Sequence, residues 1–297
     1  MKSNWWLKMS VLTLLTALLP ACSGQKLLNT LTVETGYTRA SNIVFDEKTG
    51  LKTDVYTPKG AANAPVVVFF FGGRWSEGSK ELYEFVGGAL AKQGFVAVVP
   101  DYRLYPQVKF PAFVQDAASA VRWAHDNAAR YGGDANRLFV MGHSAGAYNA
   151  AMLATDEQYL KAVGGSRAWL KGMIGLAGPY DFLPFTDADI IDMFGPPERY
   201  ADTQPINHVD GKNPPLLLMH GEDDTSVFIK NSRNLANKIK AAGGAVETVW
   251  YPKLSHAWIV ATLSTTLQKQ SDVMAYTKDF VLRKSALKPD VEPTAAS

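Results

Sequence analysis

Apolar residues along the chain follow two alternating patterns. Short uninterrupted apolar runs, such as residues 66–71 and 138–141, are typical of strands buried on both faces of a sheet. Longer segments place apolar residues at helical spacing, as between Pro111 and Tyr131. The patterns predict strands over residues 43–45, 51–57, 66–71, 95–99, 138–141, 171–177, 216–219 and 246–251. They predict helices over residues 78–93, 111–131, 145–154, 228–242 and 256–283.

The order of these elements predicts one α/β domain. A Glu-Lys-Thr-Gly turn separates the first two strands, which indicates a hairpin. The later strands alternate with helices, and such units form a mostly parallel, twisted sheet with helices on both faces. We expect the domain to span about residues 41–284, with a polar tether over residues 22–40 and a disordered tail over residues 285–297.

Composition and charge narrow the class of protein. Hydrophobic residues make up 47% of the 297 and charged residues 20%, which suits a globular core. The chain has 30 basic and 28 acidic residues, and Lys2 and Lys8 lie in an acid-free stretch over residues 1–21. Without those two lysines the rest holds 28 basic against 28 acidic residues. A nucleic-acid partner is not expected, because such binding needs a basic surface.

The N-terminus has the composition of a signal peptide, which we expect over residues 1–21. Its apolar stretch, residues 9–19, is 11 residues long, whereas a membrane-spanning helix needs about 18. Cys22 follows directly and is the only cysteine in the chain. A single cysteine excludes an intrachain disulfide and a zinc site built on cysteines.

The segment Leu19-Pro20-Ala21-Cys22 resembles the lipobox of bacterial lipoproteins, although Pro20 stands where a small residue is usual. The resemblance implies that Cys22 is acylated and becomes the mature N-terminus. Ser23 follows instead of an aspartate, which in a Gram-negative cell implies the periplasmic side of the outer membrane. The alternative is ordinary cleavage near Ala21, which would leave a periplasmic or secreted protein.

A candidate nucleophile lies between a predicted strand and a predicted helix. Gly142-His143-Ser144-Ala145-Gly146 fits the pattern G-x-S-x-G, the nucleophile elbow. Its glycines permit the sharp turn that exposes the Ser144 hydroxyl. The helix that begins at Ala145 directs the positive end of its dipole toward a developing oxyanion.

A serine hydroxyl needs a base to take its proton. Of the five histidines, His256 follows the last strand and a short loop, and the chain order Ser…Asp…His selects it. The others have structural interpretations: His125 and His208 on the surface, His143 packed beneath the elbow, and His220 stabilising the turn after its strand.

The acid should lie between the serine and the histidine, after a strand. Glu222, Asp223 and Asp224 are adjacent carboxylates in that position. Four further aspartates are interpreted as bracing loops or capping helices: Asp101, Asp116, Asp134 and Asp181.

These motifs together resemble the hormone-sensitive-lipase-like group of esterases and lipases, which have the α/β-hydrolase fold. The resemblance covers about residues 42–283. It is carried by Phe70-Phe71-Gly72-Gly73-Arg74-Trp75, Asp101-Tyr102-Arg103-Leu104, Gly132-Gly133-Asp134, residues 142–146, His220-Gly221-Glu222-Asp223-Asp224 and Ser255-His256. The family spacing His-Gly-x-x-Asp selects Asp224 as the acid.

The resemblance also implies an oxyanion hole built from the backbone N–H groups of Gly73, Arg74 and Ala145. Two residues depart from the family's usual loop, Phe71 in place of His or Tyr and Arg74 in place of a third glycine. Backbone donors survive both changes, but Phe71 removes a polar group that would help to hold the loop. The Arg74 side chain either points to solvent or attracts an anionic group of a substrate.

Residues 179–212 lie between two predicted strands and form the natural place for a short cap. Trp75, Phe185 and Trp258 are candidates for an apolar substrate pocket, with core packing as the alternative for each. A cap of this length favours esters with short acyl chains, of about two to eight carbons.

The sequence therefore predicts a serine carboxylesterase for small-molecule esters, with Ser144, His256 and Asp224 as its catalytic residues and without a cofactor or metal. An arylformamidase of the kynurenine-formamidase kind is an alternative within the fold. A lipoprotein that keeps the fold but only binds a ligand is an alternative of another class.

Overall fold

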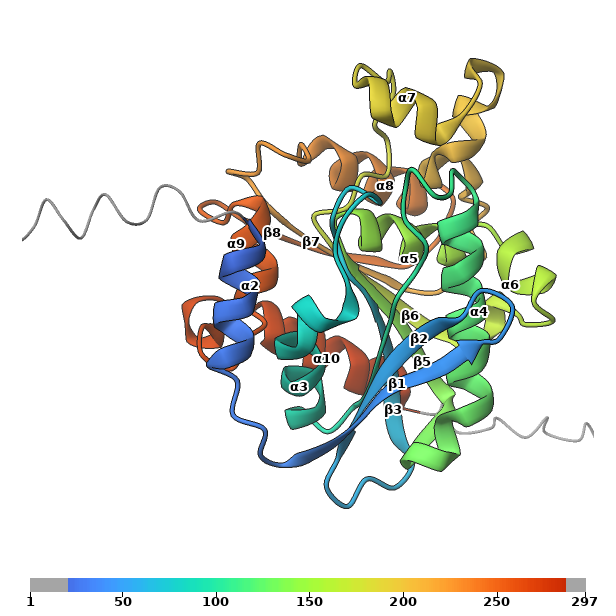
Figure 1. Ribbon diagram of the computed structural model, residues 1–297. Coiled ribbons are helices and arrows are strands. Elements are labelled where there is room, and N and C mark those ends of the chain that lie inside the picture. The colour runs from blue at the N-terminus through green and yellow to red at the C-terminus, as the bar shows by residue number, and fades with distance from the viewer. Residues whose placement is uncertain (1–20, 287–297) are drawn as a thin grey trace, which may run out of the picture.

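The computed structural model describes residues 21–286, which form one eight-stranded sheet covered by helices (Figure 1). The strands run in the order β1-β2-β4-β3-β5-β6-β7-β8 across the sheet. Their bounds are β1 (Tyr37–Asp46), β2 (Leu51–Pro58), β3 (Ala64–Phe70), β4 (Val96–Pro100), β5 (Gly133–His143), β6 (Leu170–Leu176), β7 (Leu216–Gly221) and β8 (Val246–Tyr251).

The register confirms a mostly parallel sheet with an antiparallel edge. β1 pairs with β2 as the expected hairpin, and β2 pairs antiparallel with β4. The remaining neighbours, from β4 through β3 to β8, are all parallel. The strands β3 and β4 are buried along their whole lengths, as the continuous apolar runs predict.

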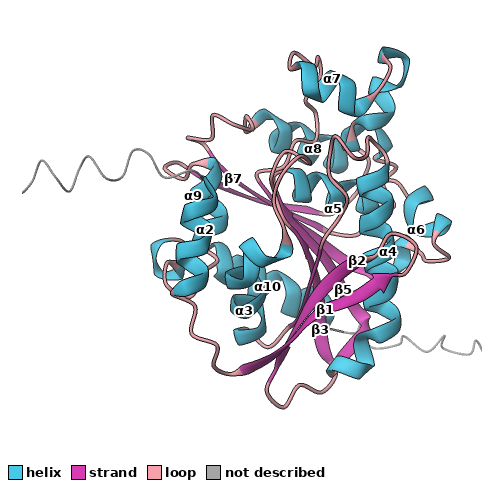
Figure 2. Cartoon of the chain, viewed as in Figure 1, coloured by secondary structure: helices cyan, strands magenta, loops and turns pink. Residues whose placement is uncertain are grey.

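Helices cover both faces of the sheet, which is the predicted α/β architecture. Figure 2 shows α3 and α10 on one side of the strands and α4 and α5 on the other. The α-helices are α2 (Ala21–Thr30), α3 (Glu84–Lys92), α4 (Ala112–Asn127), α5 (Ala145–Thr155), α6 (Gln158–Ala162), α7 (Ala188–Phe194), α8 (Lys230–Ala241), α9 (His256–Ala261) and α10 (Val273–Ser285). The 3-10 helices are η1 (Lys80–Tyr83), η2 (Ala128–Tyr131), η3 (Arg167–Trp169), η4 (Pro197–Thr203), η5 (Pro205–His208) and η6 (Gln268–Gln270).

The single long helix expected over residues 256–283 is wrong, because the segment is divided into α9, η6 and α10. The interruption holds several hydroxyl side chains, which compete with the helix for backbone partners. The Thr262 hydroxyl donates to the Ile259 carbonyl, and the Ser264 hydroxyl accepts from the Leu267 N–H. Apolar spacing persists through the segment, so the sequence pattern does not show this break.

The segment expected to be a tether over residues 22–40 differs from that prediction where the structure describes it. Residues 21–30 form α2, which lies against η1 and the start of α3. The Asn29 amide donates to the Glu81 carbonyl at 2.6 Å and accepts from the Phe85 N–H at 3.0 Å. Residues 1–20 of the predicted signal peptide (1–21) and residues 287–297 of the predicted tail (285–297) lie outside the described residues.

The proposed cap contains α7, η4 and η5. Figure 1 shows α7 at the top of the view, away from the sheet. α7 is attached to the loop before α4, since the Phe110 N–H donates to the Met193 carbonyl at 2.9 Å and Lys109 pairs with Asp192 at 2.6 Å. The cap segment is therefore a folded layer that packs against the domain.

Candidate active site

Ser144 lies in a sharp turn between β5 and α5. Its backbone has φ 54° and ψ −121°, a strained conformation for a residue other than glycine. A Cβ atom at Gly146 would lie 2.0 Å from the Phe70 carbonyl oxygen, and one at Gly142 would lie 2.2 Å from the Gly146 carbonyl oxygen. Only glycine fits both positions, which explains the G-x-S-x-G pattern.

The structure brings Ser144, His256 and Asp224 together from three separate elements. His256 is the first residue of α9, and its Nε2 lies 2.8 Å from the Ser144 Oγ. Its Nδ1 lies 2.7 Å from the Asp224 Oδ2, in the loop after β7. The Nδ1–H therefore donates to the carboxylate, which leaves Nε2 as an acceptor for the serine proton.

Four N–H groups surround Asp224, and one of them, on His220, also faces the Val227 carbonyl. Its Oδ1 accepts from the N–H groups of Ser226 and Val227, each at 2.9 Å. Its Oδ2 lies within reach of His256 and also 3.2 Å from the His220 Nε2. Burial alone would raise the pKa of Asp224, but the hydrogen bonds from His220, His256 and Val227 lower it well below its ordinary value. The carboxylate is therefore ionised at neutral pH.

The neighbouring carboxylates do not reach His256. Asp223 and Glu222 are exposed, and Glu222 pairs with Arg233 at 2.6 Å. Adjacent loop residues direct their side chains differently, and in this turn only Asp224 points inward.

Three other histidines, His220, His125 and His208, make contacts outside the Ser144–His256 pair. The His220 ring is buried, with Nδ1 2.7 Å from the Ser232 Oγ and Nε2 2.8 Å from the Val227 carbonyl, so it braces the turn that holds Asp224. His125 stacks on Trp169 with ring centroids 3.8 Å apart. His208 lies 2.7 Å from the Asp202 carbonyl within the cap.

The loop after β3 presents the backbone groups expected to form an oxyanion hole. Within the described residues, the N–H groups of Gly73, Arg74 and Ala145 have no intramolecular acceptor. The loop is anchored at Phe71, whose ring stacks on Tyr102 with centroids 4.4 Å apart. The Tyr102 hydroxyl donates to the Phe71 carbonyl at 2.8 Å. Tyr102 therefore holds the loop through the Phe71 main chain, a contact that does not depend on a polar side chain at position 71.

The Arg74 side chain is exposed, as the first of its two expectations has it, and it also makes an ion pair that neither expectation includes. Its guanidinium pairs with Asp187, the N-cap residue of α7, at 3.1 Å. Both side chains are exposed, with 59% and 48% of their surface accessible. The pair joins the oxyanion loop to the cap, and the sequence gives no signal for it because 113 residues separate the partners.

The three candidate pocket residues have different surroundings. Trp75 is buried, and its Nε1–H donates to the Asn149 Oδ1 at 3.2 Å. Phe185 is partly buried, and Trp258, two residues after His256, is 47% exposed. The aromatic rings that pack around Trp75 come from α4, α5 and the cap: Phe113, Tyr148, Phe182 and Phe194. Trp75 is thus a core residue, Phe185 belongs to the cap, and Trp258 alone is open to solvent.

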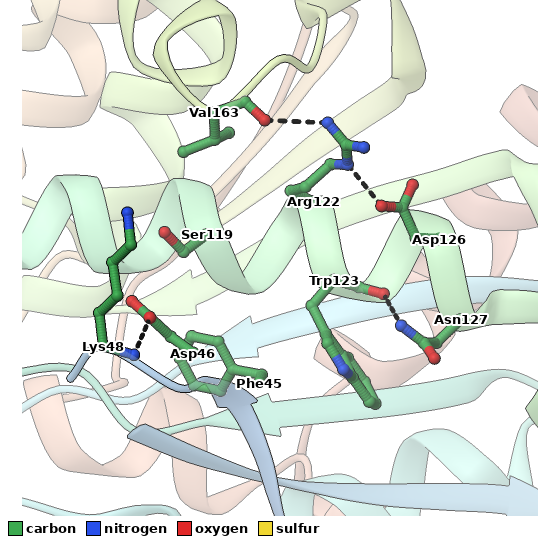
Figure 3. A pocket seen from close by; sticks show the side chains of 9 residues that line it. All are labelled: Phe45, Asp46, Lys48, Ser119, Arg122, Trp123, Asp126, Asn127 and Val163. Carbon is green, nitrogen blue, oxygen red and sulfur yellow. Dashed lines mark hydrogen bonds and ion pairs between the residues drawn. The ribbon is translucent and has the colours of Figure 1, made fainter. Parts of the chain in front are cut away.

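Two hollows in the described structure lie apart from these residues. One, of about 320 Å³, lies beside α4 and the β1–β2 turn, and its charged Arg122 and Asp126 are paired with each other (Figure 3). The other, of about 570 Å³, lies between α6 and the cap and contains His208 and Asp156. Among the described residues, no group of three or more His, Cys, Asp and Glu side chains could hold a metal ion.

Comparison with known proteins finds a family match and relatives that are named as esterases. Residues 53–239 match the BD-FAE family model. The carboxylesterase NlhH of Mycobacterium tuberculosis is 35% identical over 240 residues, which cover 72% of this chain and 73% of that protein. A probable isoprenylcysteine α-carbonyl methylesterase of Arabidopsis thaliana is 30% identical over 245 residues, 74% of this chain and 51% of that protein. The chain spans about half the length of several curated relatives that it matches.

Solved structures show the same fold. An esterase of Pyrobaculum calidifontis matches with a TM-score of 0.75 at 23% identity, covering 90% of this chain and 92% of that chain. A truncated carbohydrate esterase from gut microbiota matches with a TM-score of 0.73 at 22% identity, covering 86% and 99%. Fold and relatives define an α/β-hydrolase of the hormone-sensitive-lipase-like class, whose matched members are named as esterases. The chain belongs to the BD-FAE family.

Proposed function

We propose that this protein is a serine carboxylesterase that hydrolyses small-molecule esters. The observation that carries the proposal is the continuous hydrogen-bonded chain from Ser144 through His256 to Asp224, at 2.8 Å and 2.7 Å. A protein that only binds a ligand has no need of this order of groups. The esterase names of its relatives support the same reaction class.

In the proposed mechanism each step of acyl transfer has a group in this site. The His256 Nε2 takes the Ser144 proton as the Oγ attacks the ester carbonyl, and Asp224 stabilises the resulting imidazolium. The N–H groups of Gly73, Arg74 and Ala145 receive the oxyanion, and such donors are typically worth about 3–4 kcal/mol each. The imidazolium then protonates the leaving alcohol, and water activated by His256 releases the acid from the acyl-enzyme.

The packing around Trp75 supports short acyl groups as substrates. Tyr148 lies one turn along α5 from the nucleophile, and its ring, together with Phe182 and Phe194, encloses the Trp75 indole. Phe182 and Phe194 belong to the cap, so the cap packs directly on Trp75. Esters of about two to eight acyl carbons are therefore expected to turn over faster than emulsified long-chain triglycerides.

We also propose that the mature chain begins at an acylated Cys22 and is attached to the periplasmic side of an outer membrane. The proposal rests on the short apolar stretch and the lipobox-like segment before Cys22. No helix among residues 21–286 is long and apolar enough to cross a membrane. Mass spectrometry should find a lipidated Cys22 in the membrane fraction, with Cys22→Ala as the control. An unmodified N-terminus at another residue would contradict acylation.

A substrate panel tests the reaction. It contains p-nitrophenyl acetate, butyrate and octanoate, an acetylated xylan, a feruloyl ester and N-formylkynurenine, each tested with wild type and Ser144→Ala. The proposal expects ester turnover that depends on Ser144. Faster turnover of N-formylkynurenine than of every ester would support an arylformamidase, and no Ser144-dependent turnover would support a binding protein.

A further inference from the structure

His143, the residue before the nucleophile, is buried at the end of β5 and makes one unusual contact. Its Nε2 lies 2.9 Å from the backbone carbonyl oxygen of His256, a residue 113 positions away in sequence. The two imidazole rings lie 4.7 Å apart, tilted by 42°. The sequence interpretation of His143 as packing beneath the elbow accounts for its burial but not for this contact.

The contact fixes the tautomer of His143. A carbonyl oxygen only accepts, so Nε2 carries the proton and donates it to His256. The Nδ1 atom is buried and has no hydrogen-bond partner among the described residues. Burial, followed by the proximity of His256, lowers the pKa of His143 to about 3. The ring therefore stays neutral, and its single proton is used for the bond to the His256 main chain.

The opposite edge of the His143 ring faces the oxyanion loop. A Cβ atom at Gly72 would lie 2.9 Å from the His143 Nδ1 and 3.0 Å from the Ser144 Cβ, so the loop packs directly on both residues. His143 thus lies between the loop that carries the oxyanion donors and the backbone that carries the base. The nucleophile, Ser144, is the next residue in the chain.

On the basis of this arrangement, and resting on the function proposed above, we propose that His143 is a positioning residue. Its Nε2–H holds the His256 backbone so that the His256 Nε2 stays within hydrogen-bond distance of the Ser144 Oγ. The Asp224 carboxylate holds the side chain of His256, and the His143 ring holds the main chain of His256. Neutrality is part of this role, because a second positive charge 4.7 Å away would oppose formation of the His256 imidazolium.

Two amide variants distinguish the effect of losing the hydrogen bond from the effect of losing the imidazole ring. In His143→Gln the side-chain N–H₂ can reach the position of the imidazole Nε2, whereas in His143→Asn it is one methylene shorter and stops near the position of Nδ1. We expect His143→Asn to lower kcat on p-nitrophenyl butyrate by about 10- to 100-fold, the loss seen when a group that orients a metal-bound histidine is removed. KM should change little, and His143→Gln should recover most of the loss.

The controls separate this proposal from a purely structural role. His208→Leu removes another imidazole contact to a backbone carbonyl, at 2.7 Å in η5, and should leave kcat near wild type. Active sites are counted by stoichiometric phosphorylation with diethyl p-nitrophenyl phosphate, so that unfolded protein does not lower the apparent kcat. Equal kcat for the Gln and Asn variants, or an Asn variant within threefold of wild type, would contradict the positioning role.

A spectroscopic measurement tests the proposal without reference to activity. In protein labelled with ¹⁵N-histidine, the His143 ring should show a protonated Nε2 and a bare Nδ1 with no titration between pH 5 and 9. Titration in that range, or a proton on Nδ1, would overturn the assignment even if the enzyme is active. If wild type shows no Ser144-dependent turnover, the proposed function fails instead, while the NMR result still reports on the His143 contact.

Discussion

The Tyr102 hydroxyl donates a hydrogen bond of 2.8 Å to the backbone carbonyl of Phe71, and the two rings stack at 4.4 Å. Phe71 directly precedes the loop that carries the Gly73 and Arg74 N–H groups. Both side chains are buried, so the bond is shielded from water. A residue 31 positions further along the chain therefore anchors the oxyanion loop.

Tyr102→Phe keeps the stacked ring and removes only the hydroxyl. The Phe71 carbonyl then loses its donor, which should lower the free energy of unfolding by about 1–2 kcal/mol. The loop donors remain but are held less firmly, so kcat should fall by up to about tenfold. Urea unfolding and p-nitrophenyl butyrate kinetics measure the two effects. The exposed Tyr276→Phe is the matched control, and a kcat for Tyr102→Phe equal to that control would show that the bond does not support the loop.

Asp224→Asn should lower kcat by about 10⁴-fold, the loss seen when the aspartate of a serine-protease triad is replaced. The amide oxygen accepts the main-chain N–H groups of Ser226 and Val227, so the N–H₂ faces the His256 Nδ1 and favours the wrong imidazole tautomer. Asp223→Asn alters an exposed side chain and should cost less than about tenfold. Kinetics of both variants on one activated ester decide between the residues, and the reverse ranking would assign the acid to Asp223.

Asp101 should make stability depend on pH. Burial raises its pKa from an ordinary 3.8 to about 6, although its Oδ1 accepts from the Lys80 N–H at 2.9 Å. Because the pKa is raised in the folded state, Asp101 stabilises the fold when it is protonated. This contribution to the free energy of unfolding is fully present below about pH 4 and is lost as the pH rises through 6. Relative to Asp101→Asn, wild type should lose about 2 kcal/mol of unfolding free energy between pH 4 and pH 7.

Urea unfolding of the two proteins at pH 4, 5, 6 and 7 measures this difference. The side-chain amide introduced by Asp101→Asn can still accept from the Lys80 N–H, so the comparison isolates the charge. A difference in unfolding free energy that stays constant across the range would show that the ionised Asp101 is not destabilised in the folded state.

Trp75 and Trp258 should respond differently to truncation. Trp75→Ala removes a buried ring from the aromatic cluster and should cost about 3–5 kcal/mol of unfolding free energy. Trp258→Ala removes a half-exposed ring two residues after His256 and should cost less than about 1 kcal/mol while raising the KM for p-nitrophenyl butyrate. Thermal unfolding and steady-state kinetics test both, and an unchanged KM in Trp258→Ala would exclude that ring from the substrate site.

Patterns of neighbouring residues in the sequence were enough to predict much of the fold and of the candidate site. The apolar runs at residues 66–71 and 138–141 located β3 and the central part of β5, because strands buried on both faces leave continuous apolar stretches. The elbow at Ser144 was recognisable because its close backbone approaches permit only glycine at both flanking positions. The bond between Tyr102 and Phe71, the pair of Arg74 and Asp187, and the contact of His143 with His256 were not predicted. Each joins residues distant in sequence, and no local pattern of residues records such a contact.

The central claim is that Ser144 is the nucleophile activated by His256. Reaction with a fluorophosphonate, followed by peptide mass spectrometry, tests it most directly, in wild type, Ser144→Ala and His256→Gln. The account predicts one adduct per chain on Ser144 in wild type, none in Ser144→Ala, and labelling slowed by several orders of magnitude in His256→Gln. An adduct on another serine, or equal labelling rates in wild type and His256→Gln, would contradict it.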